Sequence, residues 1–365
     1  MPQFELLIKP AACDCNLRCD YCFYLPKHAM FGGGVHRMTE EMLELLVRRY
    51  FSVPMNTYVF NWQGGEPTLM GIDFYRRALE LQQRFRPKGS AVYNILQTNG
   101  TLLDTKWCTF LKRNKFCVGI SLDGPPELHD LHRRNAAGRG TGRIVTKAVK
   151  LLKHADVPFS TLTLVTSELA NHGIDVYDYL REHGVTNLHF IECVEQGADG
   201  SLAPYSLRQG QWSEFLLAVL GRWLERGEAG SVSIRLFDTI WEMLKGGQPM
   251  MCSHACNCRQ YLVVEHDGTI YPCDFYVTKE HRLGNIRENA FGELLSCEAF
   301  CAFGELKTTG QGGRCASCRF RAICSGDCQK NRASDGTSFL CDDWQRFYNV
   351  AIPCFERLIM QSEMR

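Results

Sequence analysis

The stretch Cys15-Asn16-Leu17-Arg18-Cys19-Asp20-Tyr21-Cys22 places three cysteines on one short loop, directly after a β-rich run at Phe4–Ile8. Three thiolates at this Cys-x3-Cys-x2-Cys spacing can bind three irons of a 4Fe–4S cube and leave the fourth iron open to a small molecule. The alternative is a zinc knuckle completed by a ligand from elsewhere, such as His28 or His36. On either interpretation, the loop indicates a metal site at the end of the first strand.

Short β-rich runs alternate with amphipathic stretches from this loop to about residue 200. Strands are expected at Phe4–Ile8, Tyr58–Trp62, Ala91–Gln97, Phe116–Ser121, Phe159–Val165 and Leu188–Ile191. Apolar residues recur at helical spacing in Thr39–Phe51, Asp73–Phe85, Thr105–Asn114, Gly142–Ala155, Ala170–Gly184 and Gln211–Arg226. Thr39 and Thr105 are typical helix starts. Six β–α repeats predict a parallel sheet with right-handed crossovers, either open or closed into a complete or partial barrel.

Polar and glycine residues follow several of the expected strands. These strand ends read Gln63-Gly64-Gly65-Glu66-Pro67, Gln97-Thr98-Asn99-Gly100, Ser121-Leu122-Asp123 and Glu192-Cys193-Val194. In a β/α barrel the loops after the strands form the active-site face, and paired glycines let the backbone come close to a ligand. The sequence therefore predicts a ligand site at this face.

The composition narrows the class of protein. The chain has 365 residues, 45% of them hydrophobic, with 41 Lys and Arg against 40 Asp and Glu. This balance is typical of a globular protein, and it argues against nucleic acid as a partner because no surplus of cations is present. No apolar run is long enough to cross a membrane, and the first residues lack the features of a secretory signal, so a cytoplasmic protein is expected.

Two domains are expected, because the composition changes at the linker Glu228-Ala229-Gly230-Ser231. Residues 1–229 would form the β/α domain, and residues 230–365 a Cys-rich domain with a β-hairpin, little periodicity and a C-terminal helix. The hairpin is expected from Tyr261–Glu265 and Thr269–Tyr271 around His266-Asp267-Gly268. Metal sites would stabilise such a domain, because it can bury little core.

The chain has 19 cysteines, an odd number in a sequence without an export signal, so a disulfide framework is a poor explanation. Nine of them group in the second domain, at positions Cys252, Cys256, Cys258, Cys273, Cys315, Cys318, Cys324, Cys328 and Cys341. A Cys-x2-Cys pair alone would indicate a zinc ribbon. Nine thiols are too many for one tetrahedral ion and enough for two four-thiolate iron–sulfur clusters.

These motifs resemble those of the radical S-adenosylmethionine (SAM) enzymes. The three-cysteine loop with Tyr21 before its last cysteine is similar to their cluster loop, and Gly64-Gly65-Glu66-Pro67 is similar to their SAM-binding element. The resemblance implies a partial (β/α)6 barrel whose open iron chelates SAM and generates a 5′-deoxyadenosyl radical. The cysteines of the second domain resemble the SPASM extension, which holds two auxiliary 4Fe–4S clusters.

The resemblance is closest to the anaerobic sulfatase-maturating enzymes. It is carried by Leu7-Ile8-Lys9-Pro10, Cys22-Phe23-Tyr24 and Tyr271-Pro272-Cys273-Asp274-Phe275-Tyr276, besides the motifs above. It implies oxidation of a Cys or Ser to Cα-formylglycine, in an unfolded sulfatase polypeptide bearing Cys/Ser-x-Pro-x-Arg. An electron donor such as flavodoxin or ferredoxin is implied as a second partner, and neither nucleic acid nor a membrane is expected.

The resemblance also implies roles for individual residues. Cys15, Cys19 and Cys22 would hold the SAM cluster, and the residues in contact with SAM would be Tyr21, Gly65, Ser121, Arg133 and Val194. One auxiliary cluster would use Cys252, Cys256, Cys273 and Cys328, and the other Cys315, Cys318, Cys324 and Cys341. Asp274 would accept the proton of the substrate thiol or hydroxyl, although an Asp here could also simply cap a turn.

Some of these assignments are open at the level of the sequence. The stretch Cys252–Cys258 is shorter than the family spacing, so Cys256 and Cys258 compete as ligands; Cys256 is favoured because Cys258 abuts the expected hairpin strand. Most of the cysteines left over are expected to be small buried hydrophobes; the eight are Cys13, Cys108, Cys117, Cys193, Cys258, Cys297, Cys301 and Cys354. Loop histidines such as His28 and His36 are expected to be solvated.

Two other functions remain possible on the sequence alone. One is another SPASM radical SAM peptide-modifying maturase, thioether-forming or epimerising. A zinc-stabilised binding module without catalysis would share the cysteines but would contain zinc in place of about a dozen irons.

Overall fold

The computed structural model describes residues 3–197 and 200–363. It contains two compact units that interleave along the chain. The first consists of Met1–Ser121, Arg133–Phe159 and Cys258–Gly304, and the second of Leu122–His132, Ser160–Asn257 and Glu305–Arg365. The domain boundary expected near residue 230 stays a prediction.

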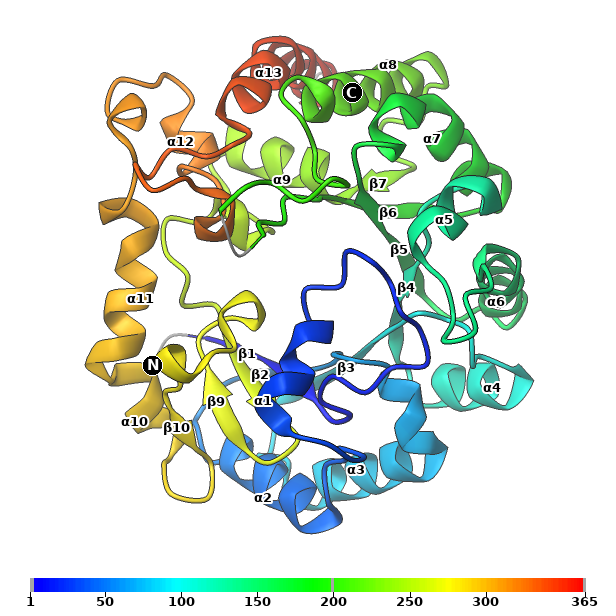
Figure 1. The fold of residues 1–365 in the computed structure, drawn as a ribbon, viewed down its shortest axis with the longest axis vertical. Helices are drawn as coiled ribbons and strands as arrows, with labels where there is room; N and C mark the ends of the chain where they lie inside the picture. The colour runs from blue at the N-terminus through cyan, green and yellow to red at the C-terminus, as the bar shows by residue number, and fades with distance from the viewer. Residues whose placement is uncertain (1–2, 198–199, 364–365) are drawn as a thin grey trace. The chain divides into compact units, whose positions relative to one another are not determined.

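The first unit is built on a sheet in which β9 alone, among the described strands, runs against the direction of the others. The strand order is β10-β9-β8-β1-β2-β3-β4. The bounds are β1 Glu5–Lys9, β2 Thr57–Trp62, β3 Ala91–Thr98, β4 Cys117–Ser121, β8 Tyr261–Glu265, β9 Thr269–Tyr271 and β10 Gly284–Asn285. β8 pairs with β1 in parallel, with Leu262 opposite Leu6, and β9 returns antiparallel to β8 as the expected hairpin. Figure 1 shows this hairpin beside β1.

Helices follow the parallel strands of this unit and pack on the sheet. They are α1 His28–Phe31, α2 Glu40–Phe51, α3 Gly71–Phe85, α4 Thr105–Arg113, α6 Gly142–His154 and α10 Phe291–Ser296. The Thr39 hydroxyl accepts a hydrogen bond from the Met42 amide, so Thr39 caps α2 as expected. Asp104, and not Thr105, caps α4 through the Trp107 amide. Buried aromatic rings fill the space between sheet and helices, among them Tyr50, Tyr58, Phe60, Trp62 and Tyr75.

The second unit has a smaller parallel sheet in the order β5-β6-β7 and a helical layer. The strands are β5 Phe159–Val165, β6 Asn187–Glu192 and β7 Ser233–Ile234, and the helices are α5 Pro126–His132, α7 Gly173–Glu182, α8 Gln211–Glu225, α9 Arg235–Leu244, α12 Arg321–Cys324 and α13 Cys341–Glu363. α13 packs along α8 (Figure 1). The helix expected at Ala170–Gly184 is divided, because a 3-10 turn at Leu169–His172 precedes α7.

The Cys-rich region is more helical than expected. Besides the C-terminal helix α13, it contains α11, Glu298–Thr309, where the sequence had indicated irregular structure. α11 has apolar residues on several sides, so its helical periodicity is weak in the sequence.

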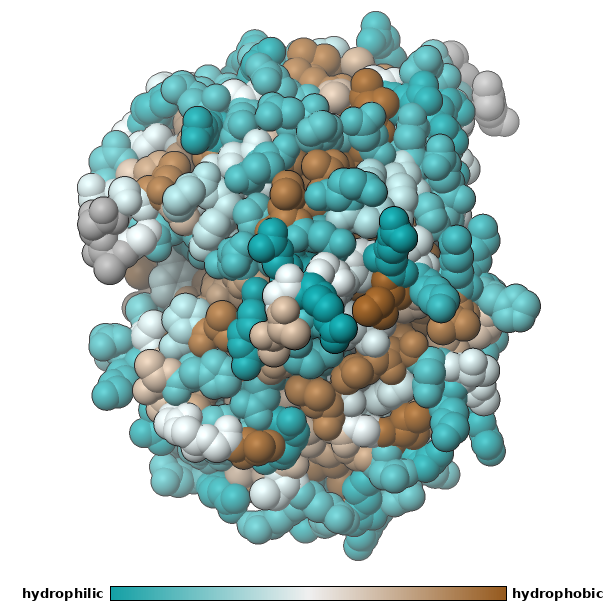
Figure 2. Space-filling model, turned by 45° about the vertical axis from the view of Figure 1, so that its right-hand side comes forward, coloured by the Kyte–Doolittle hydropathy of each residue, from teal (hydrophilic) through white to brown (hydrophobic). Residues whose placement is uncertain are grey.

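Figure 2 shows a face on which hydrophobic side chains lie scattered among hydrophilic ones. Within residues 3–197 and 200–363, the helices are all too short or too polar to cross a membrane.

Candidate functional site

The three-cysteine loop lies against the paired glycines that follow β2. The amide of Glu66 donates to the carbonyl of Asp14 at 2.8 Å. Gly65 has φ +52°, and a Cβ at this position would lie 2.2 Å from the same carbonyl oxygen. Only glycine fits this approach, because any side chain would displace the loop.

The thiols of this loop lie close together. Burial raises the pKa of Cys15 to about 12, and the charges of Glu66, Cys19 and Cys22 add to this effect. The Leu17 amide and the Asn99 side-chain amide both point at the Cys15 sulfur, at 3.3 and 3.7 Å. Thiolates are the iron ligands, so filling this loop with iron would release protons and favour the charge that burial opposes.

A buried carboxylate stabilises the turn after the paired glycines. Glu66 is 1% exposed, and burial raises its pKa. Four donors surround it, namely the Thr68 amide and hydroxyl, the Thr98 hydroxyl and the Asn99 amide, at 2.6–3.0 Å. Glu66 therefore joins the ends of β2 and β3, and its oxygens are already occupied by protein donors.

The end of β3 also contacts the cluster loop through side chains that sequence reasoning missed. The Asn99 amide donates to the Asn16 oxygen at 2.8 Å, and Asn16 donates in turn to the Thr101 hydroxyl at 2.8 Å. Asn16 lies inside the three-cysteine motif, but its partners are more than 80 residues away, so spacing carries no signal for this contact.

Two of the residues expected to contact SAM lie together. The Arg133 guanidinium lies 5.3 Å from the centre of the Tyr21 ring, a cation–π contact. The backbone segments next to these two residues are hydrogen-bonded to each other, because the Arg18 amide donates to the Arg134 carbonyl at 2.8 Å. Ser121, the last residue of β4, is buried.

Asp274 belongs to the same unit and faces a buried cation. It begins a 3-10 turn after Cys273, and its Oδ2 lies 3.4 Å from the Lys9 ammonium. Lys9 is the last residue of β1 and only 1% exposed, and its ammonium also lies 4.6 Å from the centre of the Tyr24 ring. Lys9 could have been identified from the sequence, because it is a charged residue in an apolar strand, but this signal was not used.

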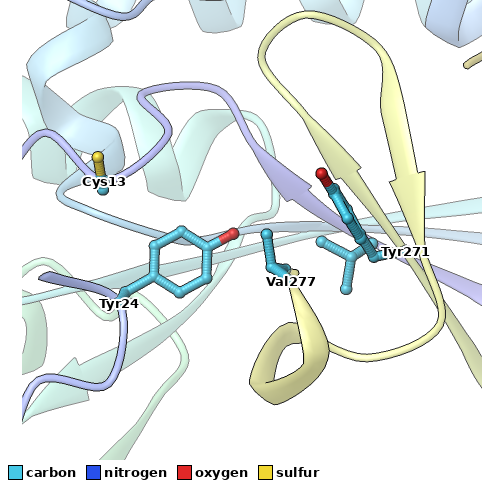
Figure 3. Packing of buried hydrophobic residues seen from close by; sticks show 5 residues of the cluster. Cys13, Tyr24, Tyr271 and Val277 are labelled. Atoms are coloured by element: carbon cyan, nitrogen blue, oxygen red, sulfur yellow. The ribbon is translucent and has the colours of Figure 1, made fainter. Parts of the chain in front are cut away.

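Tyr24 joins the surroundings of Lys9 to a fully buried carboxylate. Its hydroxyl donates to Glu265, which is fully buried at the end of β8. Burial, and then the charge of Glu265, raise the pKa of Tyr24 well above its usual range. Figure 3 shows Tyr24 in one hydrophobic cluster with Cys13, Tyr271 and Val277. The ammonium of Lys27, which donates to the Val277 carbonyl at 2.7 Å, also lies near the carboxyl groups of Glu265 and Asp274.

In the second unit, four of the expected cluster ligands line one cavity. Cys315, Cys318, Cys324 and Cys341 surround it together with Phe320, Trp344 and Tyr348. Burial raises the pKa of Cys324 to about 12, and the Gln345 side chain donates to the Cys341 sulfur at 3.6 Å. The aromatic rings therefore form part of the wall around this group of thiols.

Cys328 and Cys252 are neighbours in the same unit. Burial raises the pKa of Cys328, and the nearby Asp327 and Cys252 act in the same direction. Asp327 is 2% exposed and accepts hydrogen bonds from the Cys328 amide and the Ser338 hydroxyl, both at 2.6 Å. Asp327 was not identified from the sequence, where it looks like an ordinary turn residue.

Val194 belongs to this unit too. Its carbonyl accepts a hydrogen bond of 2.6 Å from the Lys330 ammonium, which also binds Glu195 at 2.6 Å. Lys330 lies two residues after Cys328, so it joins the loop after β6 to the Cys-rich segment.

Some of the secondary expectations were wrong, and others stay open. Most of the unassigned cysteines were expected to be buried, but only Cys13, Cys108 and Cys193 are, and Cys117 is exposed. His36, His129 and His254 are buried, although loop histidines were expected to be solvated. Cys256 is exposed, whereas the Cys258 amide donates to the Gly304 carbonyl; the choice between them as ligands stays open.

Comparisons with known proteins cover nearly the whole chain. The profile of the Radical SAM superfamily matches residues 12–190, and SPASM, an iron-sulfur cluster-binding domain, matches residues 252–319. A cysteine-type anaerobic sulfatase-maturating enzyme of Clostridium perfringens is 38% identical over 97% of both chains. A serine-type enzyme of Bacteroides thetaiotaomicron is 32% identical over 98% of this chain and 91% of its own.

Solved structures match as well. Native anSMEcpe with bound AdoMet and Cp18Cys peptide has a TM-score of 0.89 at 36% identity, over 98% of this chain and 99% of its own. Streptococcus suis SuiB, at 14% identity and a TM-score of 0.63 over 92% of this chain and 76% of its own, shares the fold. These matches confirm the expected fold class, a radical SAM α/β fold followed by a Cys-rich SPASM region.

Proposed function

The chain belongs to the anaerobic sulfatase-maturating enzymes, radical SAM enzymes with a SPASM region, and from this premise we propose which of its residues serve the reaction. The enzyme oxidises a Cys or Ser side chain to Cα-formylglycine, with SAM and 4Fe–4S clusters as cofactors. Its substrate is a peptide segment. We propose an unfolded sulfatase bearing Cys/Ser-x-Pro-x-Arg, with flavodoxin or ferredoxin as electron donor.

The donor sets fit these cofactors. The four thiols at Cys315, Cys318, Cys324 and Cys341 line one cavity, which suits a four-thiolate cluster. The three thiols at Cys15, Cys19 and Cys22 share one loop and would leave one iron for SAM. When bound, SAM and the clusters supply a 5′-deoxyadenosyl radical that removes a hydrogen atom from the substrate Cβ, and an acceptor for the second electron.

We assign the remaining expected ligands to the other auxiliary cluster, namely Cys252, Cys256, Cys273 and Cys328. The proximity of Cys252 to Cys328 supports half of this set. Tyr21, Gly65, Ser121, Arg133 and Val194 would bind SAM. The guanidinium of Arg133 suits the SAM carboxylate, because it can form a bidentate pair, and the Tyr21 ring would keep it in place.

Asp274 would act as the proton acceptor, and the observation that carries this assignment is its pairing with the buried Lys9. A carboxylate accepts the S–H or O–H proton only when it is ionised and within hydrogen-bond reach of it. The Lys9 ammonium donates to Oδ2 at 3.4 Å, while Oδ1 lies 3.7 Å from the Cys273 sulfur. From Cys, the product of this oxidation is a thioaldehyde that water hydrolyses with loss of sulfide; from Ser, it is the aldehyde directly.

The test uses the anaerobically reconstituted full chain, SAM, dithionite and short peptides carrying Cys-x-Pro-x-Arg or Ser-x-Pro-x-Arg. Mass spectrometry of the peptide and counting of 5′-deoxyadenosine should give one aldehyde per deoxyadenosine with at least one peptide. Deoxyadenosine with both peptides unchanged would contradict sulfatase maturation and favour another peptide modification.

The proton acceptor is tested by Asp274→Asn, with Asp73→Asn as the control because Asp73 is exposed on α3. Asp274→Asn should reduce aldehyde formation by about 100-fold or more while deoxyadenosine formation continues. Aldehyde formation at the unmodified rate would remove Asp274 from the mechanism.

Serine substitution of Cys256 and of Cys258, followed by iron analysis, decides which of the two is the cluster ligand. Loss of a ligand should lower the iron content and change the EPR spectrum of the reduced auxiliary cluster, whereas substitution of the other cysteine should change neither. We also propose a cytoplasmic location, because the cysteine ligands must stay reduced to bind iron.

A further inference from the structure

A second group of metal-ligating side chains lies beside the cluster loop and includes none of the cysteines assigned to a cluster. Cys13 and Asp14 come from the loop after β1, His28 begins α1, and His36 follows α1. One ligand atom from each of the four lies within 4.8 Å of the other three. The donors of a tetrahedral zinc ion lie roughly 3.3–3.8 Å apart, so the group would have to contract by about an ångström.

Both ring nitrogens of His36 face oxygen atoms. Its Nε2 lies 3.2 Å from the Phe31 carbonyl oxygen, which can only accept, so the tautomer with its hydrogen on Nε2 donates to Phe31. Its Nδ1 faces the Asp14 Oδ1 at 3.0 Å. In this tautomer the lone pair of Nδ1 and the carboxylate oxygen point at the same place, as two ligands of one metal ion do.

The contacts around this group match the outer shell of a metal site. A histidine that binds metal usually donates its other ring N–H to a carbonyl, and the Phe31 carbonyl lies in position to accept from His36 Nε2. A ligating carboxylate is usually hydrogen-bonded through its second oxygen. Asp14 Oδ2 accepts from the His36 amide at 2.8 Å and from the Arg37 guanidinium, which leaves Oδ1 for a metal.

We propose that Cys13, Asp14, His28 and His36 form a structural zinc site that ties the segment 28–36 to the loop after β1. One thiolate, one carboxylate and two imidazoles suit zinc, and the two negative ligands balance its charge. Cys13 and His36 are buried while Asp14 and His28 are partly buried, and four protein ligands would leave no open position for a substrate. Its ligands are separate from Cys15, Cys19 and Cys22, so zinc and an iron–sulfur cluster can be present together.

The experiment measures zinc in protein whose clusters are already filled, because empty Cys-rich sites also bind zinc. Full-length protein is reconstituted with iron and sulfide, incubated with one equivalent of zinc and desalted. Metal analysis should give one zinc beside about twelve irons per chain. Zinc K-edge absorption should show one sulfur at about 2.3 Å and three nitrogen or oxygen neighbours at about 2.0–2.1 Å.

Variants locate the zinc. Cys13→Ser and His28→Gln should each weaken zinc binding by about tenfold or more in competition with a chromogenic chelator. Cys117→Ser and His154→Gln are the matched controls, because both side chains are exposed and far from the group in sequence; they should bind zinc like the unmodified chain. His28 is only partly buried, so His28→Gln gives a folded variant even if Cys13→Ser does not.

Three outcomes would overturn the proposal: fewer than about 0.1 zinc per iron-filled chain, a shell of four sulfurs, or equal zinc binding by His28→Gln and its control. The first would mean that a hydrogen on His36 Nδ1, and not a metal ion, joins the ring to Asp14. All three are independent of formylglycine formation, so they leave the proposed function untouched.

Discussion

Substitution of Gly65 by alanine tests how closely the turn after β2 supports the cluster loop. The new Cβ would lie 2.2 Å from the Asp14 carbonyl oxygen and 2.9 Å from that of Ala12, so the loop backbone must move by about 1 Å. Both neighbours are main-chain atoms, which cannot avoid the clash by changing a rotamer. The 2.8 Å hydrogen bond from the Glu66 amide to Asp14 would be lost with this movement.

The magnitude follows from three contributions. A left-handed backbone costs alanine about 1 kcal/mol relative to glycine. Overpacking adds about 1–3 kcal/mol, and the lost hydrogen bond about 1 kcal/mol. Gly65→Ala should therefore cost about 3–5 kcal/mol. Gly227→Ala is the control, because Gly227 has a similar φ of +63° with no atom within 4 Å of the added Cβ, so only the backbone contribution of about 1 kcal/mol applies.

The strain of Gly65→Ala should appear in the cluster loop first. Isothermal titration with SAM under anaerobic conditions should show binding weakened by about 100-fold or more, and iron analysis should show loss of about four irons per chain. Gly227→Ala should keep both properties. If Gly65→Ala binds SAM like the control and retains its iron, the loop tolerates the clash and the argument from close approach is wrong.

Three other predictions concern single side chains. Glu66→Gln places an NH2 group among hydrogen-bond donors that already surround the carboxylate. It should lower the free energy of unfolding, measured by urea denaturation, by about 1–3 kcal/mol. An unchanged free energy would contradict the four-donor arrangement. Cys341→Ser should lower the iron content from about twelve to about eight per chain, and Cys354→Ser, outside the cavity, should not; equal contents would remove Cys341 from the ligands. Burial, and then the charge of Arg235, lower the pKa of His189 to about 3. Between pH 6.5 and 3 the unfolded chain therefore binds a proton that the folded chain does not, so stability falls as the pH falls. His189→Gln should make the stability depend less on pH in this range, as measured by thermal denaturation. An unchanged slope would contradict the effect of burial on His189.

The strands, the hairpin and one helix cap could be predicted from the sequence, because local patterns define them. Each of the six expected parallel strands is present, and the hairpin Tyr261–Glu265 and Thr269–Tyr271 has the expected bounds, because alternation and the His266-Asp267-Gly268 turn are local signals. The cap at Thr39 was predictable for the same reason. The helix α11 was missed because its apolar residues do not keep to one face.

Contacts between distant residues were not predictable in this way. Lys9 and Asp274 are 265 residues apart, and only the parallel pairing of β1 with β8 brings their segments together. Asn16 and Asn99 meet because β1 and β3 end at the same edge of the sheet. Spacing identifies which cysteines form a motif, but it cannot identify the polar residues that the folded sheet adds around them.

The paired glycines illustrate how the first strand determines the site. Gly64 and Gly65 adjoin each other, yet a Cβ at each would meet a different neighbour. At Gly64 it would lie 2.2 Å from Cδ of Lys9, so this glycine leaves room for the buried ammonium that pairs with Asp274. At Gly65 it would meet the carbonyl of Asp14, so that glycine leaves room for the cluster loop. Since Lys9 ends β1 and the cluster loop follows this strand, one strand positions both the cation that pairs with the proposed proton acceptor and the thiols for the SAM cluster. Gly64 leaves space for the cation, and Gly65 leaves space for the loop that carries the thiols.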